Sequence, residues 1–325
     1  MSVLILAQHH DEHAAAVAAE LEQLGGHAEV VDTSHFPDRA RLVARFESCE
    51  ECRKRLFLLE LERGRIDLAD VGAAWWRRPH PPAASARLTR PDHQVFAVNE
   101  THEALRGLWH ALDVFWINDP GRDEVAHRKL LQLRVAQDVG LEIPSTLVTN
   151  DVAAARSYVD ARAYRDVICK AFSATEQQWR ETRLVGEPEL AALENVRYAP
   201  VIFQEYVPAE VDLRVTVVGQ ELFTGAIYSQ ESEYPVDFRM DMGNTRVEAD
   251  ELPAEVAEQL LELMARLGIV YGAIDLRRTP DGRHVFLEVN PAGQWLFVEQ
   301  ATGQPIARAL AQELLAHDRA AVATS

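Results

Sequence analysis

Apolar residues recur along this chain with two spacings, one typical of buried strands and the other of amphipathic helices. Residues 3–7 form a short continuous apolar run that predicts a buried strand, and residues 12–24 have helical spacing and end at a pair of glycines. Further strands are expected at 28–31 and 71–76. This order predicts an open α/β layer. No Rossmann glycine fingerprint follows the first strand, so the opening does not indicate a nucleotide site.

The middle of the chain alternates between helical and extended patterns. We expect the charged stretch 41–64 to form a helix or a helical hairpin, and helical spacing returns at 99–112 and 124–139. A short strand at 114–118 precedes an Asp-Pro-Gly turn at 119–121. We place the first domain boundary at this turn.

Two β-hairpins are expected towards the end of the chain. One joins 212–218 to 222–229 through Gly-Gln, and the other joins 272–278 to 284–289 through Pro-Asp-Gly. The last lobe is expected to begin with a strand at 201–206. The predicted fold is α/β (α+β), with an N-terminal open α/β lobe at 1–118, a central lid at 119–200 and a C-terminal antiparallel-sheet lobe at 201–325.

The charge of the chain narrows its range of partners. Its 325 residues carry a formal net charge of −18, which argues against nucleic-acid and membrane partners because both favour a basic face. The N-terminal apolar run is too short for a signal peptide or a membrane span. Three cysteines are too few for a disulfide scaffold and suit a reducing cytosol, so we expect a cytoplasmic protein. Cys49 and Cys52 have CxxC spacing without a second pair, which does not favour a metal or redox role.

Lysine is rare in this chain, because only Lys54, Lys129 and Lys170 are lysines among 33 Lys and Arg residues. Lys129 opens the helix that precedes Pro144, and Lys170 follows the apolar stretch 167–169. A compact ammonium in such a place can reach a phosphate held between two lobes. Lys54 is expected to be an ordinary solvated amine.

The sharpest local pattern is a pair of carboxylates and an amide on the strands of the last hairpin. Asp275 lies on one strand, and Glu288 and Asn290 lie two apart on the other, so the latter two share a face. An isolated Glu-x-Asn is usually a solvated pair, but here the neighbouring residues are apolar, and acids beside an interior run need a partner. Mg²⁺ prefers such hard oxygen ligands, so the pattern predicts a magnesium site.

The order of these features resembles the ATP-grasp superfamily over about residues 115–310. The Asp-Leu-Arg and Asp-Phe-Arg elements look like those of RimK-type ligases, which add glutamate to a protein terminus. The Trp-Trp-Arg-Arg-Pro and Gln-Trp elements look more like the microviridin-type (graspetide) ligases, which form side-chain ester or amide links within a ribosomal precursor peptide. The elements that carry the resemblance are Trp75-Trp76-Arg77-Arg78-Pro79, Lys129, Lys170, Gln204-Glu205-Tyr206-Val207, Asp212-Leu213-Arg214, Asp237-Phe238-Arg239, Asp275, Glu288-Val289-Asn290-Pro291 and Gln294-Trp295.

The resemblance implies ATP and Mg²⁺, with two ions, as cofactors. It also implies a role for each site residue: Lys129 and Lys170 at the phosphates, Glu205, Tyr206 and Val207 at the adenine hinge, Asp212 at the ribose, Arg214 and Arg239 as catalytic groups at the substrate carboxylate and the transferred phosphoryl group, and Asp275, Glu288 and Asn290 as metal ligands. Many members of the superfamily cover the phosphates with a glycine-rich loop, whereas residues 173–182 contain no glycine.

We therefore expect an ADP-forming ligase that activates Asp or Glu side chains of a precursor peptide as acyl-phosphates, which a hydroxyl or amine then attacks. The expected partner is a peptide with a leader and an acidic core, and the resemblance suggests a homodimer. The alternatives are a RimK-like or small-molecule carboxylate–amine ligase and a non-catalytic ATP-binding module. Arg77 and Arg78 follow a strand end, where a grip on an acidic peptide competes with an ordinary surface pair.

Overall fold

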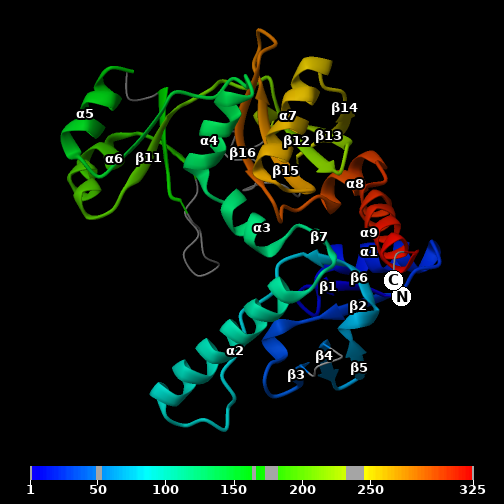
Figure 1. Ribbon diagram of the computed structural model, residues 1–325. Helices are drawn as coiled ribbons and strands as arrows, with labels where there is room; N and C mark the ends of the chain where they lie inside the picture. Colours follow the sequence, from blue (N-terminus) through cyan, green and yellow to red (C-terminus); the bar gives the residue numbers. More distant parts are fainter. Residues whose placement is uncertain (1, 49–52, 163–165, 173–181, 232–244, 324–325) are drawn as a thin grey trace.

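The computed structural model describes residues 2–48, 53–162, 166–172, 182–231 and 245–323 and arranges them in three lobes (Figure 1). The blue-to-cyan N-terminal lobe lies below the other two in this view. The green central lobe is at the upper left, and the last lobe, yellow to orange, is at the upper right. The predicted mixed α/β architecture is therefore confirmed.

A parallel sheet forms the centre of the N-terminal lobe. Its elements are β1 (Ser2–Leu6), α1 (Glu12–Gln23), β2 (Ala28–Val31), β6 (Val71–Trp76) and β7 (Phe115–Ile117). The strand order is β2-β1-β6-β7, with every pair parallel. The apolar run 3–6 is fully buried in this sheet, as its composition predicts. α1 starts where Asp11 accepts a hydrogen bond from the Ala14 amide.

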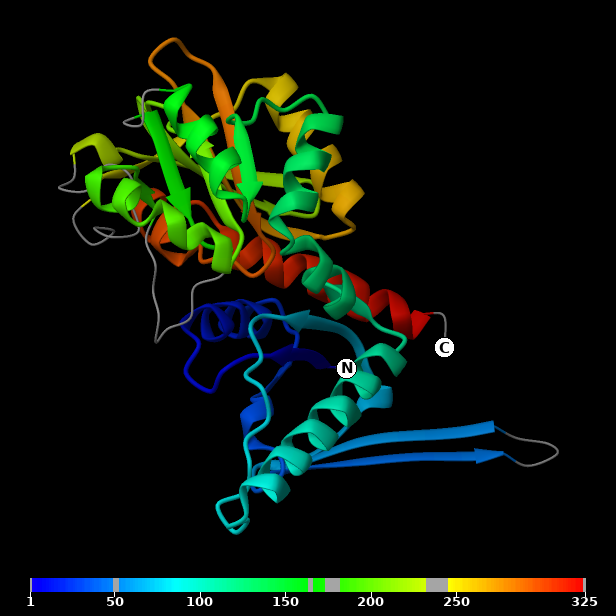
Figure 2. The same ribbon diagram turned by 90° about the vertical axis from the view of Figure 1, so that its left-hand side faces the viewer.

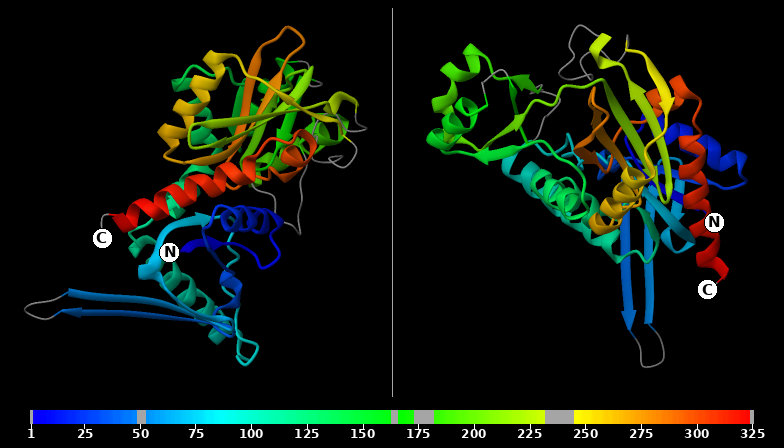
Figure 3. Two further views of the ribbon diagram at one scale, coloured as in Figure 1. Left: turned by 90° about the vertical axis from the view of Figure 1, so that its right-hand side faces the viewer. Right: turned by 90° about the horizontal axis from the view of Figure 1, so that it is seen from above.

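Residues 41–48 and 53–61 of the stretch 41–64 are extended, so the prediction of a helix there is wrong. β3 (Ala40–Ser48), β4 (Arg53–Leu61) and β5 (Gly64–Asp67) form a three-stranded antiparallel sheet. Leu42 faces Leu59 and Ala44 faces Phe57, so one face carries apolar cross-strand pairs with a period of two. The β3–β4 hairpin extends well away from the lobe (Figures 2 and 3). Cys49 and Cys52 lie outside the described residues.

Three helices connect the first lobe to the rest of the chain: α2 (Pro91–Ala111), α3 (Pro120–Ala126) and α4 (Lys129–Asp138). The single helix expected at 124–139 is therefore wrong, because the chain breaks at His127 and Arg128. α3 begins earlier than expected, where Asp119 accepts a hydrogen bond from the Arg122 amide and Pro120 takes the first helical position. The apolar spacing runs through the break, so periodicity alone did not reveal it.

The central lobe is a small antiparallel sheet with two helices. Its elements are β8 (Thr146–Thr149), α5 (Val152–Asp160), β9 (Val167–Lys170), β10 (Arg183–Leu184), α6 (Glu187–Ala191) and β11 (Val201–Glu205). The strand order is β10-β9-β11-β8. β11 pairs with β8 and β9, so this strand does not begin the last lobe as expected. Phe203 of β11 packs with Val159 and Val167 in the core of this lobe.

The last lobe is a five-stranded antiparallel sheet covered by a helix. Its elements are β12 (Val211–Val218), β13 (Glu221–Ile227), β14 (Val247–Asp250), α7 (Ala254–Leu267), β15 (Tyr271–Arg278) and β16 (His284–Asn290), in the order β14-β13-β12-β15-β16. Both predicted hairpins are confirmed, and Gly219 turns the first with a φ of +58°. Leu260, Leu263 and Met264 of α7 are buried against this sheet.

The chain returns to the N-terminal lobe through α8 (Leu296–Thr302) and α9 (Ile306–Ala323). Leu310 and Leu314 of α9 share one hydrophobic core with Val3, Ile5 and Trp75. Figure 3 shows α9, in red, running from the last lobe alongside the first. This shared core packs the last lobe against the N-terminal lobe. None of the helices in the described ranges has both the length and the apolar character needed to cross a membrane.

Candidate functional site

The predicted site residues of the last lobe lie side by side on three neighbouring strands. Arg214 on β12 pairs with Asp275 on β15, and Asp275 pairs with Glu288 on β16. The Arg214 Nε atom lies 3.1 Å from Asp275 Oδ1, and both side chains are largely buried. Asn290 is two residues further along β16, opposite Ala273. The antiparallel register thus brings together two carboxylates and an amide, as the hairpin pattern predicted, and it also places the cation Arg214 beside them.

Helix α4 contributes a second cation to this cluster. The Lys129 ammonium contacts the Glu288 carboxylate, and each side chain is a little over one-fifth exposed. The helix is held in place by Gln132, whose amide donates to the Val289 carbonyl at 2.7 Å and accepts from the Val289 N–H at 3.2 Å. Gln132 is buried, and the sequence analysis did not single it out. A polar residue on the apolar face of a helix was the signal for it.

The oxygen donors of the cluster suit a hard cation such as Mg²⁺. Asp275 and Glu288 are opposite each other on β15 and β16, so both carboxylates can offer oxygens to one ion, although each also contacts a cation, Arg214 or Lys129. Among the residues that the structure describes, no three His, Cys, Asp or Glu side chains form a metal-binding group. An ion here would therefore use the Asn290 amide, water and phosphate oxygens in addition to the two carboxylates.

The predicted nucleotide residues lie along the junction of the central and last lobes. Lys170 ends β9, half-buried, opposite Ile202 of β11. The Glu205 amide donates to the Ser145 carbonyl at 2.9 Å, and the Tyr206 amide donates to the Asp166 carbonyl at 2.8 Å. These bonds fix the segment that leaves β11 as an extended edge between the two lobes.

Asp212 lies in a buried ion pair that braces this edge. Its carboxylate accepts from Arg277 Nε at 2.8 Å and from the Ser229 hydroxyl. Arg277 also donates to the Val207 carbonyl at 2.8 Å, and its guanidinium lies 5.3 Å from the centre of the Tyr206 ring. Burial lowers the pKa of Arg277, but the adjacent Asp212 more than offsets this and leaves it raised. Contact of Asp212 with a ribose remains a prediction.

Arg77 and Arg78 have different environments, although they are adjacent at the end of β6. Arg77 is buried and donates to the carbonyls of Ala292 and Gly293, at 2.7 and 3.0 Å, so it is not the surface cation considered from the sequence. Arg78 donates through Nε to the same Ala292 carbonyl at 2.6 Å. Its φ of 135° is rare for a non-glycine residue and indicates backbone strain at this point.

The loop that follows Asn290 is held by residues that the sequence analysis missed. Asn118 donates to the carbonyls of Tyr271 and Pro291, at 2.9 and 3.0 Å. His13 accepts from the Trp295 amide at 3.2 Å, and burial, together with Arg77, lowers its pKa to about 3. The N-terminal lobe therefore positions the end of β16. Arg239 and the rest of its Asp-Phe-Arg element lie outside the described residues.

Comparison with known proteins gives consistent results. A family model described as the MvdD pre-ATP grasp domain matches residues 2–124. The macrocyclase MdnC from Microcystis aeruginosa MRC, bound with precursor peptide MdnA, is 30% identical with a TM-score of 0.86, over 97% of this chain and 99% of that chain. The macrocyclase MdnB from the same organism is 33% identical with a TM-score of 0.81, over 97% of this chain and 99% of that chain.

A third similar structure is the RiPP-associated ATP-grasp ligase from Chryseobacterium gregarium, in complex with ADP and a leader and core peptide. It is 25% identical to this chain with a TM-score of 0.87, over 97% of this chain and 96% of that chain. No curated protein sequence matches the chain in a sequence comparison.

Proposed function

The chain belongs to the ATP-grasp ligase family that contains the macrocyclases MdnC and MdnB, so it is an ADP-forming ligase, and we propose that its substrate is a ribosomal precursor peptide with a leader and an acidic core. In this proposal, ATP activates an Asp or Glu side chain as an acyl-phosphate. A Ser or Thr hydroxyl or a Lys amine of the same peptide then displaces phosphate and closes an ester or amide link.

One observation carries the proposal: Arg214, Asp275, Glu288 and Lys129 form a single cluster on adjacent elements. Phosphoryl transfer to a carboxylate brings two anions together, so fixed positive charge is what the reaction chiefly needs. Arg214 can orient the substrate carboxylate with its planar fork, and Lys129 can meet the phosphate oxygens. Both side chains come from regular elements, so their positions are set before the substrates arrive.

The remaining nucleotide contacts follow from the position of each residue between the lobes. Lys170 would meet the phosphates from the central lobe, and the edge from Glu205 to Val207 would hold the adenine through main-chain groups. Asp212 would act near the ribose, through the pair with Arg277 that stiffens this edge. Arg239 is proposed for the transferred phosphoryl group on the resemblance alone.

We also propose that Asp275, Glu288 and Asn290 hold Mg²⁺, with two ions at the ATP phosphates. Bound Mg²⁺ would neutralise charge on the transferring phosphoryl group. The donor chemistry described above supports this assignment, and the similar C. gregarium ligase is in complex with ADP.

The proposed activity is tested by incubating the purified protein with ATP, Mg²⁺ and a synthetic precursor peptide with an acidic, Thr-, Ser- and Lys-containing core. Loss of one water mass per link, with ADP formed in step, would support a peptide cyclase. Gain of an amino-acid mass on an added protein would instead indicate a RimK-like ligase. Binding of ATP without turnover, with any carboxylate tried, would leave a non-catalytic module.

The assembly and location of the protein are part of the same proposal. We propose a homodimer in the cytoplasm, with the first domain at 1–118 as expected and with β11 (Val201–Glu205) assigned to the central domain rather than to the last one. Phe46 on the β3–β4 hairpin and Phe96 on α2 are both about two-thirds exposed, and exposed aromatic residues are typical of a protein interface. Light scattering of the purified protein would test the dimer.

A further inference from the structure

The proposed ligation needs a proton acceptor as well as an activated carboxylate. A hydroxyl must lose its proton as it attacks an acyl-phosphate, and an ammonium must lose one before it can attack. A side chain with a pKa near the working pH takes this proton best. In the described sheet of the last lobe, the site side chains are cations and acids in contact with each other. The following inference rests on the proposed function and asks which group takes the proton.

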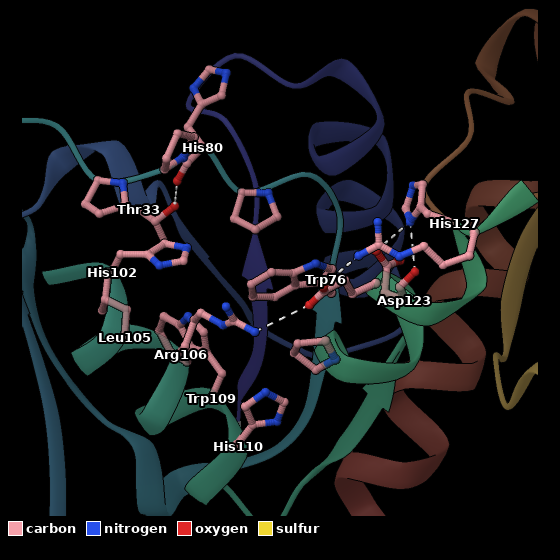
Figure 4. A pocket seen from close by; sticks show the side chains of 16 residues that line it. Thr33, Trp76, His80, His102, Leu105, Arg106, Trp109, His110, Asp123 and His127 are labelled. Carbon is pink, nitrogen blue, oxygen red and sulfur yellow. Dashed lines mark hydrogen bonds and ion pairs between the residues drawn. The ribbon is translucent and has the colours of Figure 1, made fainter. Parts of the chain in front are cut away.

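A cavity of about 490 Å³ lies in the N-terminal lobe beside the strand end that carries Arg78 (Figure 4). Its walls come from Thr33 after β2, the end of β6 with the loop 79–82, the second half of α2, and α3 with the break before α4. Trp76 and Trp109 line its apolar part. A cavity of this size and composition can hold a side chain and neighbouring backbone of a peptide.

His127 lies in the wall of this cavity, at the break between α3 and α4. It is two residues before Lys129, which contacts Glu288, so the break connects the cavity to the proposed ATP-facing cluster. The His127 side chain is 46% exposed and therefore accessible to a substrate. Figure 4 shows it beside Asp123 at the right of the cavity, with His102 and Arg106 of α2 at the left.

The hydrogen bonds of His127 identify which ring nitrogen can take a proton. Nδ1 lies 2.8 Å from the main-chain oxygen of Asp123. A carbonyl oxygen can only accept, so Nδ1 must carry hydrogen, and in the neutral ring Nε2 is the basic nitrogen. The Asp123 carboxylate lies 3.3 Å from the same Nδ1. This arrangement fixes the ring and its tautomer, as in other histidine bases that a carboxylate orients.

The charges around His127 favour proton uptake. Asp123 is buried, and among the described residues its Oδ1 atom has no hydrogen-bond partner, so a positive ring nearby stabilises it. Burial lowers the pKa of His127, but Asp123 more than offsets this and leaves the pKa raised, while Arg78 acts in the lowering direction. Glu124 pairs with Arg128 at 2.8 Å and with Arg106 at 3.4 Å, so this one carboxylate offsets part of the charge of these two cations.

We propose that His127 is the general base of the ligation, and that the cavity it lines holds the segment of the precursor that carries the attacking hydroxyl or amine. Asp123 is a positioning residue that holds Nδ1–H and so presents Nε2. The attacking oxygen or nitrogen forms a bond to the acyl carbon, the bond from that carbon to the phosphate oxygen breaks, and the proton of the nucleophile passes to Nε2. Phosphate leaves with the electron pair, and the His127 proton is released to solvent after the link closes.

The test separates activation from attack by using hydroxylamine, a neutral small nucleophile that traps acyl-phosphates without a protein base. Wild-type protein and the His127→Gln variant are each given ATP, Mg²⁺ and the synthetic precursor, with and without hydroxylamine. The variant is expected to form peptide hydroxamate at the wild-type rate. Its rate of cross-link formation should fall about a hundredfold or more. His93→Gln, an exposed histidine at the start of α2, is the matched control and should leave both rates unchanged.

Two results would overturn the inference. Retained cross-linking by His127→Gln would show that another group takes the proton, and loss of hydroxamate together with cross-linking would place His127 in activation instead. Absence of hydroxamate with the wild-type protein would count against the proposed function itself, which keeps the two failures distinct. Circular dichroism and the thermal midpoint of the variant confirm that it is folded.

A pH profile gives a second readout that a merely structural role would not move. The base works when His127 is neutral, so the ligation rate should rise with pH through the pKa of His127, which lies above its ordinary value of 6.5. Asp123→Asn removes the charge that raises this pKa, so the inflection should move to lower pH. An inflection that stays in place in this variant would overturn the assignment of Asp123.

Discussion

The cluster on the last sheet and the cavity beside α3 hold their charged groups in different ways. On the sheet side, Arg214 and Lys129 each contact a carboxylate, and the groups are carried by strands in fixed register and by a helix that Gln132 locks to β16. On the N-terminal side, His127 stands at a break between two helices, half-exposed, beside a cavity.

The difference matches the two half-reactions of a ligase. Activation joins two anions and needs fixed cations, which a sheet supplies with little reorganisation. Attack needs room for a second group of the substrate and a side chain that changes its protonation state. In the proposal made above, activation takes place at the cluster on the last sheet and attack takes place at the break between α3 and α4. Each prediction below tests one part of that division.

The largest effect is expected when the sheet side loses a carboxylate. Glu288→Gln keeps the shape of the side chain but removes the charge that Lys129 contacts and that a cation would need. The rate of ADP formation should fall at least about a thousandfold, and the hydroxylamine-trapped product should fall with it. Asp281→Asn, at the exposed turn of the same hairpin, is the control. Hydroxamate formation by this variant would contradict the account, because activation would then not depend on the cluster that contains Glu288.

The second-largest effect is expected at the contact between the N-terminal lobe and the last lobe. Arg77 is buried, and its bonds to the carbonyls of Ala292 and Gly293 connect β6 to the loop after Asn290. Arg77 Nε also lies 3.4 Å from the Asp11 carboxylate. Arg77→Met leaves these oxygens and Asp11 without their cation, so the free energy of unfolding should fall by about 3 kcal/mol. Urea denaturation measures this, with the exposed Arg87→Met as control. A loss equal to that of the control would mean that Arg77 does not join the lobes.

The stability of this contact between the two lobes should also depend on pH, because of His13. Burial, together with Arg77, holds the pKa of His13 at about 3, whereas the unfolded chain has its ordinary value of 6.5. The unfolded state then binds more protons between these values, so stability should be full above pH 6.5 and fall as the pH drops. The slope from this group is on the order of 1 kcal/mol per pH unit. His13→Gln should flatten the profile in this range, and an equal slope in both proteins would count against the buried neutral histidine.

The smallest effect is expected at a residue outside the cluster and the cavity. Arg283 lies at the exposed end of the β15–β16 hairpin and pairs with Asp281 and Glu142. Exposed ion pairs contribute little, so Arg283→Ala should leave the unfolding midpoint and the rate of ADP formation unchanged. A large loss of activity in this variant would extend the functional region beyond the cluster at Asp275.

The sequence predicted the parts of this molecule that depend on local pattern. The last hairpin was visible because a Pro-Asp-Gly turn separates two apolar strands, and that register places Asp275 opposite Glu288. The β3–β4 hairpin was taken for a helix, because charged residues on its outer face obscured the period of two. The break at His127 was missed because the apolar spacing of α3 continues into α4.

Long-range roles could not be predicted in the same way. Arg77 bonds to a carbonyl 215 residues away, and nothing near either residue in the chain indicates that contact. Asp212 and Arg277 likewise form their buried pair across two strands that are 65 residues apart. The sequence shows that such side chains are charged but not that they are buried. Their structural roles depend on contacts between distant strands, which only the structure shows.

The central claim is that a peptide carboxylate is activated as an acyl-phosphate before the link forms. The most direct measurement uses a precursor whose Asp and Glu side chains carry ¹⁸O, followed by mass analysis of the phosphate released. The account predicts one ¹⁸O atom in phosphate for each link formed, with ADP as the other product. Unlabelled phosphate, or AMP in place of ADP, would contradict it.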